Sequence, residues 1–273
     1  MANQQVALVT GVSSGIGEAT ARALAAEGFR VFGTVRSADG IVPDGVEHVA
    51  MDVRDEASVA AAVTFILSRA GRIDALVNNA GATILGAIEE TDTAQAQALF
   101  DVNFFGAARV TRAVLPAMRA RRGGAVVTIG SVSGRVALPM VGPYHASKWA
   151  LEGMIEALRY ELIPFGIRVA LVEPGAYRTE LHVNEIRARA AGRGDSPYAA
   201  LLETYQRQSA ALRRDGVDAL VDVIYRAATS PHPRLRWFVG PTSFTGGRMR
   251  AFCPDWLYEW LMRIAFRIRA PRL

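Results

Sequence analysis

The chain has 273 residues, 51% of them apolar, and a formal net charge of +5. This length suffices for one α/β domain with a sizeable core, and no apolar run is long enough to span a bilayer. The single cysteine, Cys253, excludes an intrachain disulfide and argues against a cysteine-rich metal site, so we expect no metal.

The arginines are scattered and accompany no nucleic-acid motif, so we expect no nucleic-acid partner despite the positive charge. The first residues lead directly into an apolar strand, without a leader of the secretory type. This start predicts a cytoplasmic protein.

The first predicted element is a buried strand over residues 6–10, and a glycine-rich turn connects it to helical sequence over residues 18–27. Strand, glycine-rich turn and helix form the context of a phosphate-binding loop, because glycine allows close approach and a helix N-terminus offers free N–H groups. The candidate cofactor-binding residues here are Gly11, Ser13, Ser14, Gly15, Ile16 and Gly17. Two alternatives are a purely structural turn and a serine that only caps the helix.

The second predicted strand, residues 30–35, ends at Arg36. In a dinucleotide fold an acid here would bind the ribose hydroxyls, whereas an arginine would bind a 2′-phosphate. The chain has no acid until Asp39. This favours NADP(H), with NAD(H) still open, unless Arg36 is simply solvated.

Two further strands end at the same edge of the predicted sheet. Residues 47–51 lead to Asp52, which could accept a hydrogen bond from the adenine amino group or cap a helix predicted over residues 56–70. Residues 73–77 lead to short amides and small residues that suit a cofactor crevice, namely Asn78, Asn79, Ala80 and Gly81.

The remaining elements complete an alternation of strands and helices. A long helix is predicted over residues 99–122, despite Gly106 and Pro116, and strands over 125–129, 168–172 and 236–239. There is no internal repeat or linker, so we expect one domain over residues 1–273. Its predicted fold class is α/β: a Rossmann-type, doubly wound parallel sheet of about seven strands with helices on both faces.

Tyr144 and Lys148 lie four residues apart in a predicted helix, so their side chains share one face. Lys148 is the only lysine among the 31 Lys and Arg residues. A phenol titrates near pH ~10, but an ammonium and a helix N-terminus both favour phenolate. Gly142 and Pro143 would place Tyr144 in the first turn. We predict an acid/base pair; the alternative is a surface tyrosine and lysine on an ordinary helix.

The motifs together resemble the classical short-chain dehydrogenase/reductase family. They occur in the family's order as TGVSSGIG at 10–17, NNAG at 78–81, Asn103 in DVNFFG, Ser131, YHASK at 144–148 and EPGAYRT at 173–179. The resemblance covers residues 5–180 closely. One departure is Gly130 before Ser131, where many members have a second serine.

The resemblance implies a role for each matching residue. Tyr144 would be the general acid/base, Ser131 would hydrogen-bond the substrate oxygen, and Lys148 would bind the ribose and modulate the tyrosine. Asn103 would hold a water that links Lys148 to solvent. Asn79 and Val53 would line the adenosine side, while Pro174, Gly175 and Thr179 would flank the nicotinamide and its phosphate.

Hydride transfer is the cofactor's chemistry, so the protein has to align the two reacting carbons and manage one proton. We therefore expect an oxidoreductase. Two alternatives remain: a non-catalytic NADP(H)-sensing protein on this fold, and a family member that catalyses epimerisation or dehydration.

The apolar segment 135–141, together with Tyr177 and a lid over about 176–214, predicts a lipophilic ketone or secondary alcohol as substrate. Steroid, retinoid, acyl and aryl ketones all fit, unless these residues are only core. The lid is predicted to be helical and to restart at 195–197. His145 and His182 could line the pocket, without a catalytic role.

The C-terminal extension, about residues 254–270, contains a predicted amphipathic helix over 255–269. Glu259, Arg263 and Arg267 form its polar stripe, and a wide apolar arc fills much of the rest. Such an arc needs a covering surface. We expect the domain core or a subunit interface of a homodimer or homotetramer, or else peripheral contact with a membrane.

Overall fold

The computed structural model describes residues 4–37, 39–177, 186–188, 191, 195–212 and 216–268. Within these residues, one parallel sheet of seven strands has the order β3-β2-β1-β4-β6-β7-β9. The strands are β1 (Val6–Thr10), β2 (Arg30–Val35), β3 (Val46–Ala50), β4 (Ala75–Asn78), β6 (Gly124–Ile129), β7 (Ile167–Pro174) and β9 (Arg236–Val239). The predicted α/β fold class is confirmed.

Helices cover both faces of this sheet, which explains why its strands are almost continuously apolar. On one face, Leu24 of α1 (Gly15–Ala26) and Ile224 of α7 (Asp218–Thr229) belong to one buried cluster. On the other, α2 (Glu56–Ala70), α4 (Ala107–Ala120) and α5 (Gly142–Leu162) contribute Ile66, Val114 and Ile155. The apolar faces of these helices therefore pack on the sheet and hold the ends of its strands in place.

The long helix predicted over residues 99–122 begins earlier and is interrupted. It comprises α3 (Thr93–Phe100), a π-helical segment η1 (Asp101–Gly106) and α4, which accommodates Pro116. The Asp92 side chain accepts a hydrogen bond from Gln95 N at 2.7 Å and so caps the start of α3. Asn103 lies in the π-helical segment, an irregularity that is frequent at functional sites.

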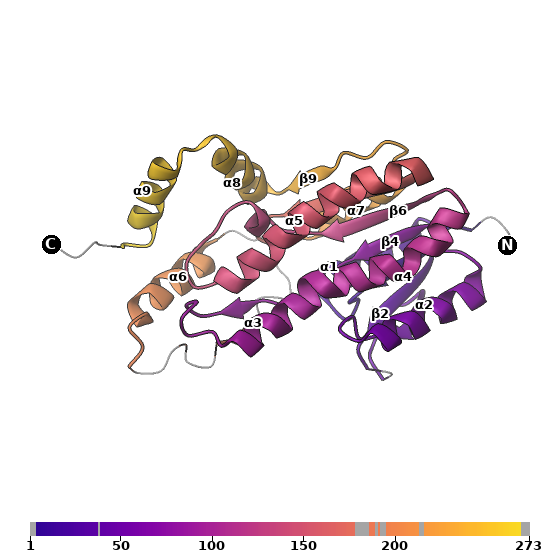
Figure 1. Ribbon diagram of the computed structural model, residues 1–273, viewed down its shortest axis with the longest axis horizontal. Coiled ribbons are helices and arrows are strands. Elements are labelled where there is room, and N and C mark those ends of the chain that lie inside the picture. Colours follow the sequence, from indigo (N-terminus) through magenta and orange to yellow (C-terminus); the bar gives the residue numbers. More distant parts are fainter. Residues whose placement is uncertain are drawn as a thin grey trace.

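Figure 1 shows α6 (Ala199–Ala211), α8 (Pro241–Phe252) and α9 (Asp255–Ala265) beyond the end of the sheet toward which the strands point. The predicted all-helical lid is wrong in part, because β8 (Ile186–Arg187) pairs with β5 (Ile84–Leu85). Helix α6 does follow residues 195–197. Helix α9 ends four residues before its predicted end, and Arg267 has φ +55°, so Arg267 is not on the helical stripe.

Candidate active site

A cleft of about 1030 Å³ opens at the carboxyl ends of the strands. It brings together most of the residues that the sequence singled out. The predicted residues that line it are Gly11, Ser13, Ser14, Gly15, Ile16, Arg36, Asp52, Val53, Asn79, Ala80, Gly81, Ser131, Tyr144, Lys148, Pro174 and Gly175. Gly17 and Asn103 are buried and do not line the cleft, and Thr179 lies outside the described residues.

The glycine-rich turn after β1 is held against the end of β4. Gly11 and Gly15 have φ values of +71° and +62°, which favour glycine. A Cβ on Gly17 would collide with the carbonyl oxygen of Gly11, so a side chain there would push the turn apart. Asn79 Nδ2 donates to the Thr10 and Gly11 carbonyls at 2.9 Å each. The turn is therefore a fixed cradle of main-chain atoms.

Ser14 stands at the N-cap of α1, but its side chain makes no capping hydrogen bond. For Ser14, the alternative that it only caps the helix is therefore wrong. Its hydroxyl lines the cleft at the positive end of α1, where an anionic phosphate is stabilised.

Charged residues meet at the ends of β2 and β3. Arg36 is exposed and lines the cleft. Asp52 does not cap α2, because that cap is Asp55, whose side chain accepts from Ala57 N at 2.9 Å. Instead, hydrogen bonds from Arg54, the shortest 2.6 Å, hold the pKa of Asp52 below its usual range. Arg54 also lines the cleft, although the sequence analysis did not single it out.

Ser131, which follows β6, and Tyr144 and Lys148, which belong to α5, line the same cleft. Ser131 caps a short 3₁₀ turn, η2 (Val132–Gly134), and accepts from Ser133 N at 3.1 Å. Helix α5 begins at Gly142, so Tyr144 lies in its first turn as predicted. Lys148 Nζ donates to the Ile129 carbonyl at 2.9 Å and lies 5.9 Å from the centroid of the Tyr144 ring.

Burial has the largest effect on the pKa values of Tyr144 and Lys148. It raises the pKa of Tyr144, and a hydrogen bond with Ser131 opposes the rise only partly. Burial also lowers the pKa of Lys148 to about 8. The expected lowering of the tyrosine pKa is therefore wrong in this structure, because desolvation of the phenolate outweighs the groups that favour it.

Asn103 connects the loop after β4 to α5. Its Nδ2 donates to the Ala82 carbonyl at 3.0 Å and to Ser147 Oγ at 2.9 Å, and its Oδ1 accepts from Ala82 N at 2.8 Å. Ser147 is the immediate neighbour of Lys148. The side chain of Asn103 thus fixes the position of the lysine, and both of its polar atoms already have protein partners.

The other end of the cleft has a mostly apolar lining. Segment 135–141 contributes Val136, Leu138 and Val141, as predicted, and Tyr177 also lines this end. The predicted lid contributes Tyr205, Gln208, Ser209 and Leu212, from α6 and its C-terminal end. Met262, Ala265 and Phe266, from α9 and its C-terminal end, also line the cleft, although the sequence analysis did not place them here. Side chains from distant parts of the sequence therefore define this end.

His145 positions segment 135–141. Its Nε2 accepts from Leu138 N at 3.1 Å, and its Nδ1 lies 3.0 Å from the Ser133 carbonyl oxygen. Burial lowers its pKa, which favours the neutral ring that these two contacts require. His182, the other histidine considered, lies outside the described residues.

A buried cluster of charges lies one helical turn beyond Lys148, and the sequence analysis missed it. Glu152, one helical turn after Lys148, accepts from Arg236 Nε at 2.9 Å. Glu173, at the end of β7, lies 3.5 Å from Arg135 Nε and 3.7 Å from Arg236 Nε. Burial and the Glu152 carboxylate raise the pKa of Glu173 to about 8. The cluster joins α5, β7, β9 and the segment after Ser131.

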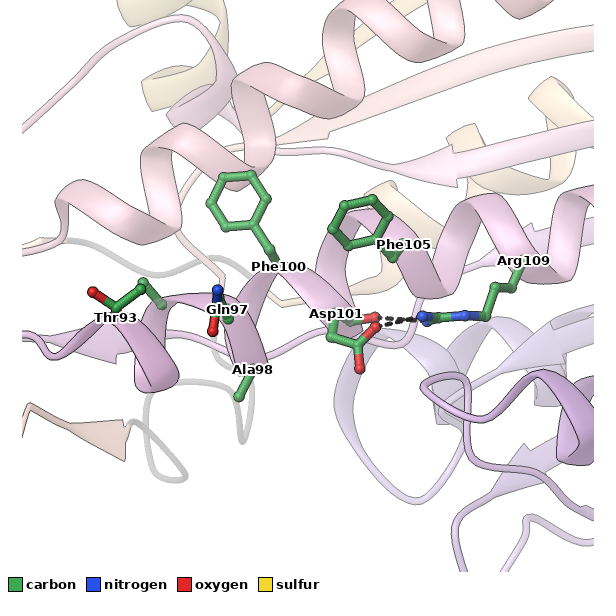
Figure 2. Close-up of a pocket in the computed structure, with 8 residues that line it drawn as sticks. Thr93, Gln97, Ala98, Phe100, Asp101, Phe105 and Arg109 are labelled. Atoms are coloured by element: carbon green, nitrogen blue, oxygen red, sulfur yellow. Dashed lines mark hydrogen bonds and ion pairs between the residues drawn. The ribbon is translucent and has the colours of Figure 1, made fainter.

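A second hollow, of about 620 Å³, lies along α3, η1 and α4 (Figure 2). Its lining includes Phe100 and Phe105, and its charged pair is internally satisfied, since Arg109 Nη2 lies 2.7 Å from Asp101 Oδ1. None of the predicted site residues lines this hollow. We therefore assign the chemistry to the larger cleft.

Among the described residues, no three His, Cys, Asp or Glu side chains gather into a metal-binding group. In the same part of the chain, no helix combines the length and apolar character needed to cross a bilayer.

Residues 5–190 match the family model described as short chain dehydrogenase. A 3-ketodihydrosphingosine reductase from Bacteroides thetaiotaomicron is 35% identical over 97% of this chain and 99% of its own. The estradiol 17-beta-dehydrogenase 1 of Rattus norvegicus is 35% identical over 92% of this chain and 78% of its own.

A solved short chain dehydrogenase from Burkholderia cenocepacia J2315, in complex with NADP, superimposes with a TM-score of 0.74. It is 28% identical, and the match covers 99% of this chain and 100% of that one.

Proposed function

The chain belongs to the short-chain dehydrogenase family and is an oxidoreductase, and we propose that it transfers a hydride between NADP(H) and a lipophilic ketone or secondary alcohol. The observation that carries this proposal is the meeting of Ser131, Tyr144 and Lys148 with the glycine cradle in one cleft. A dinucleotide fits this arrangement, because Gly11 and Gly17 have no room for a side chain and let the turn pack closely at the start of α1, where Ser13 and Ser14 line the cleft.

When bound, the cofactor supplies the hydride at C4 of its nicotinamide. In the direction of reduction, the Ser131 hydroxyl donates a hydrogen bond to the substrate oxygen. The raised pKa of Tyr144 keeps its phenol protonated, so that it can deliver the proton that the developing alkoxide needs. The Lys148 ammonium stabilises the tyrosinate that remains.

The proton returns to Tyr144 from solvent by way of Lys148, whose pKa of about 8 allows it to give up and regain a proton near neutrality. Because the side-chain atoms of Asn103 are engaged with Ala82 and Ser147, we assign any relay water to the main-chain carbonyl of Asn103. The π-helical backbone at this position supports that assignment.

Arg36 supports a preference for NADP(H). It is exposed at the tip of β2 within the cleft, as a 2′-phosphate partner must be. Arg54 is a second partner, but its ion pair with Asp52 already uses much of its hydrogen-bonding capacity. The solved relative in complex with NADP also favours this cofactor. NAD(H) stays a weaker alternative.

The apolar lining of the other end supports a lipophilic substrate. The names of two relatives, a 3-ketodihydrosphingosine reductase and an estradiol 17-beta-dehydrogenase, point to hydrophobic molecules that carry one reacting oxygen. We therefore propose a steroid-like or long-chain ketone. A homodimer or homotetramer in the cytoplasm stays our prediction for the assembly, and sedimentation of the purified protein tests its size.

The experiment is a fluorescence titration with NADPH and NADH, followed by a screen of steroid, retinoid, acyl and aryl ketones for oxidation of the reduced nicotinamide. We expect tighter binding of NADPH and oxidation by one ketone class. Tight binding without turnover would instead favour a cofactor sensor. Conversion of substrate with no net change in cofactor absorbance would favour an epimerase or dehydratase.

A further inference from the structure

Helix α9 has a bare apolar outer face. Trp256, Trp260 and Ile264 recur at helical spacing, and their exposed fractions are 71%, 55% and 57%. Phe252, at the end of α8, extends the same C-terminal patch and is 88% exposed. A contiguous group of large exposed apolar side chains marks an interaction surface on a water-soluble fold.

The opposite side of α9 forms a wall of the cleft. Met262, Ala265 and Phe266 line it, and the Tyr258 hydroxyl donates to the Ala137 carbonyl at 2.9 Å. This bond ties α9 to the segment that carries Val136 and Leu138. One face of α9 therefore lines the substrate end of the cleft, and the opposite face is exposed to solvent.

The C-terminal sequence that contains this face has an excess of positive charge. Residues 246–273 contain six arginines but only two acids, Asp255 and Glu259. Arg263 is exposed on α9, and Arg267 is exposed two residues beyond the end of that helix. The ion pair of Arg263 with Glu259 is 3.6 Å long and solvent-exposed, so it contributes little and can be exchanged for another anion.

This composition distinguishes between two occupants. A twofold interface would place the same arginine-rich patch on both sides, so like charges would be brought together. Tryptophan beside arginine is the composition of a helix that lies in the interface of an anionic bilayer, where the indole has both apolar and polar surroundings and the guanidinium meets lipid phosphate. Figure 1 shows α9 at one end of the molecule, beyond α8.

We propose that the exposed C-terminal surface defined by Phe252, Trp256, Trp260, Ile264, Arg263 and Arg267 binds an anionic phospholipid bilayer, and that the substrate passes from this bilayer into the cleft beside α9. The passage of substrate rests on the proposed function, whereas the binding of the bilayer does not. Bilayer binding and substrate passage are connected by α9, because the same helix would contact the membrane with one face and line the cleft with the other.

The first test is co-sedimentation of the full chain with vesicles of phosphatidylcholine, with or without phosphatidylglycerol. We expect binding to the anionic vesicles that weakens with salt. Trp256→Ala/Trp260→Ala should lower the partition coefficient about tenfold or more, since both indoles leave the interface. The matched control is Phe65→Ala/Ile163→Ala, which truncates exposed apolar side chains on α2 and η3 (Ile163–Phe165) and should bind like the unmodified protein.

Replacing Arg263 and Arg267 with glutamine should weaken binding to anionic vesicles by about fivefold per arginine and leave binding to neutral vesicles unchanged. Three outcomes overturn the proposal: no binding of the unmodified chain to any vesicle, equal binding by the double tryptophan variant, and a tryptophan-dependent dimer in light scattering without vesicle binding. The last outcome would assign this face to a second copy.

The second test compares a water-soluble ketone with a long-chain ketone embedded in anionic vesicles. Trp256→Ala/Trp260→Ala should keep its rate on the soluble ketone and lose about tenfold on the embedded one. Equal rates for both proteins on the embedded ketone would overturn the passage of substrate. If the unmodified chain reduces neither ketone although it binds vesicles, the proposed function fails and the membrane face stands.

Discussion

The two ends of the cleft are built in different ways. At the cofactor end, strand termini and hydrogen bonds from the Asn79 amide and to the Thr10 hydroxyl hold the main chain of the lining against the sheet. At the substrate end, part of the lining comes from α6 and α9, and α9 has no fully buried residue within its bounds. The cofactor end is therefore part of the hydrophobic core of the domain, whereas much of the substrate end is formed by helices that pack outside that core.

This difference has a physical consequence. A lining made of main-chain atoms can change only if the fold changes, whereas a lining of side chains on exposed helices can change one residue at a time. Substitutions at the cofactor end should therefore affect the reaction with every substrate, and those at the substrate end should affect the choice among substrates.

Tyr144→Phe should have the largest effect. Removal of the hydroxyl abolishes proton delivery, so kcat should fall by about 10²–10⁴-fold for every ketone, while the affinity for NADPH stays within about twofold because no cofactor-binding group in the cradle changes. Stopped-flow turnover and NADPH fluorescence titration measure the two quantities. Tyr160→Phe, on the exposed side of α5, is the control. Unchanged turnover in Tyr144→Phe would rule out the proposed acid.

Arg36→Ala should weaken NADPH by about 10- to 150-fold, which corresponds to the ~1.5–3 kcal/mol of a charged hydrogen bond, and should change NADH little. Arg54→Ala should have a smaller effect, because Asp52 already pairs with this guanidinium. Arg22→Ala, an exposed arginine of α1, is the control. Equal losses for both cofactors would show that Arg36 does not contact the 2′-phosphate.

Met262→Ala sharpens the comparison at the substrate end. Truncation of this cleft-lining side chain should raise KM for a bulky ketone by about tenfold, in the range of one or two lost methylene contacts, and leave NADPH affinity unchanged. Steady-state kinetics with one bulky and one small ketone measure the effect. The same proportional loss for both ketones would contradict a role in substrate selection.

Glu173→Gln tests the buried charge cluster that joins α5, β7 and β9. The folded pKa of Glu173 is about 8, above an unfolded value of about 4.3, so its ionisation makes the folded state progressively less stable as the pH rises from about 4.5 to 8. The glutamine cannot ionise. The variant should therefore gain free energy of unfolding relative to the unmodified protein over this window, by about 1 kcal/mol or more at pH 8.

Thermal melts across the pH range measure this gain. Glu156→Gln is the matched control, because a hydrogen bond from Arg236 lowers the pKa of Glu156. Its contribution to stability is present above the unfolded pKa and is lost in acid, so its removal should destabilise the protein near neutrality. Parallel pH profiles for Glu173→Gln and the unmodified protein would mean that Glu173 is ionised throughout.

The sequence predicted the strands and the cofactor end well because each depends on contiguous residues. A buried parallel strand needs an apolar run, and the turn from Gly11 to Gly17 needs its glycines next to one another in the chain. Arg54, Glu173 and Met262 escaped prediction for the opposite reason. Their surroundings depend on residues far away in the chain, and no local pattern records that α9 returns to the cleft. The tyrosine pKa was missed because burial depends on the whole fold.

The single lysine allows site-selective labelling of the chain. Lys148 is the one lysine side chain in the sequence with which an amine-reactive reagent can react, and it is buried beside Tyr144 with a pKa of about 8. A substantial share of its amine is therefore neutral and nucleophilic in mildly alkaline buffer. Acylation at this position, read out by the mass of one tryptic peptide, reports occupancy of the cleft directly, and a ligand's protection of that peptide gives its affinity without any catalytic turnover.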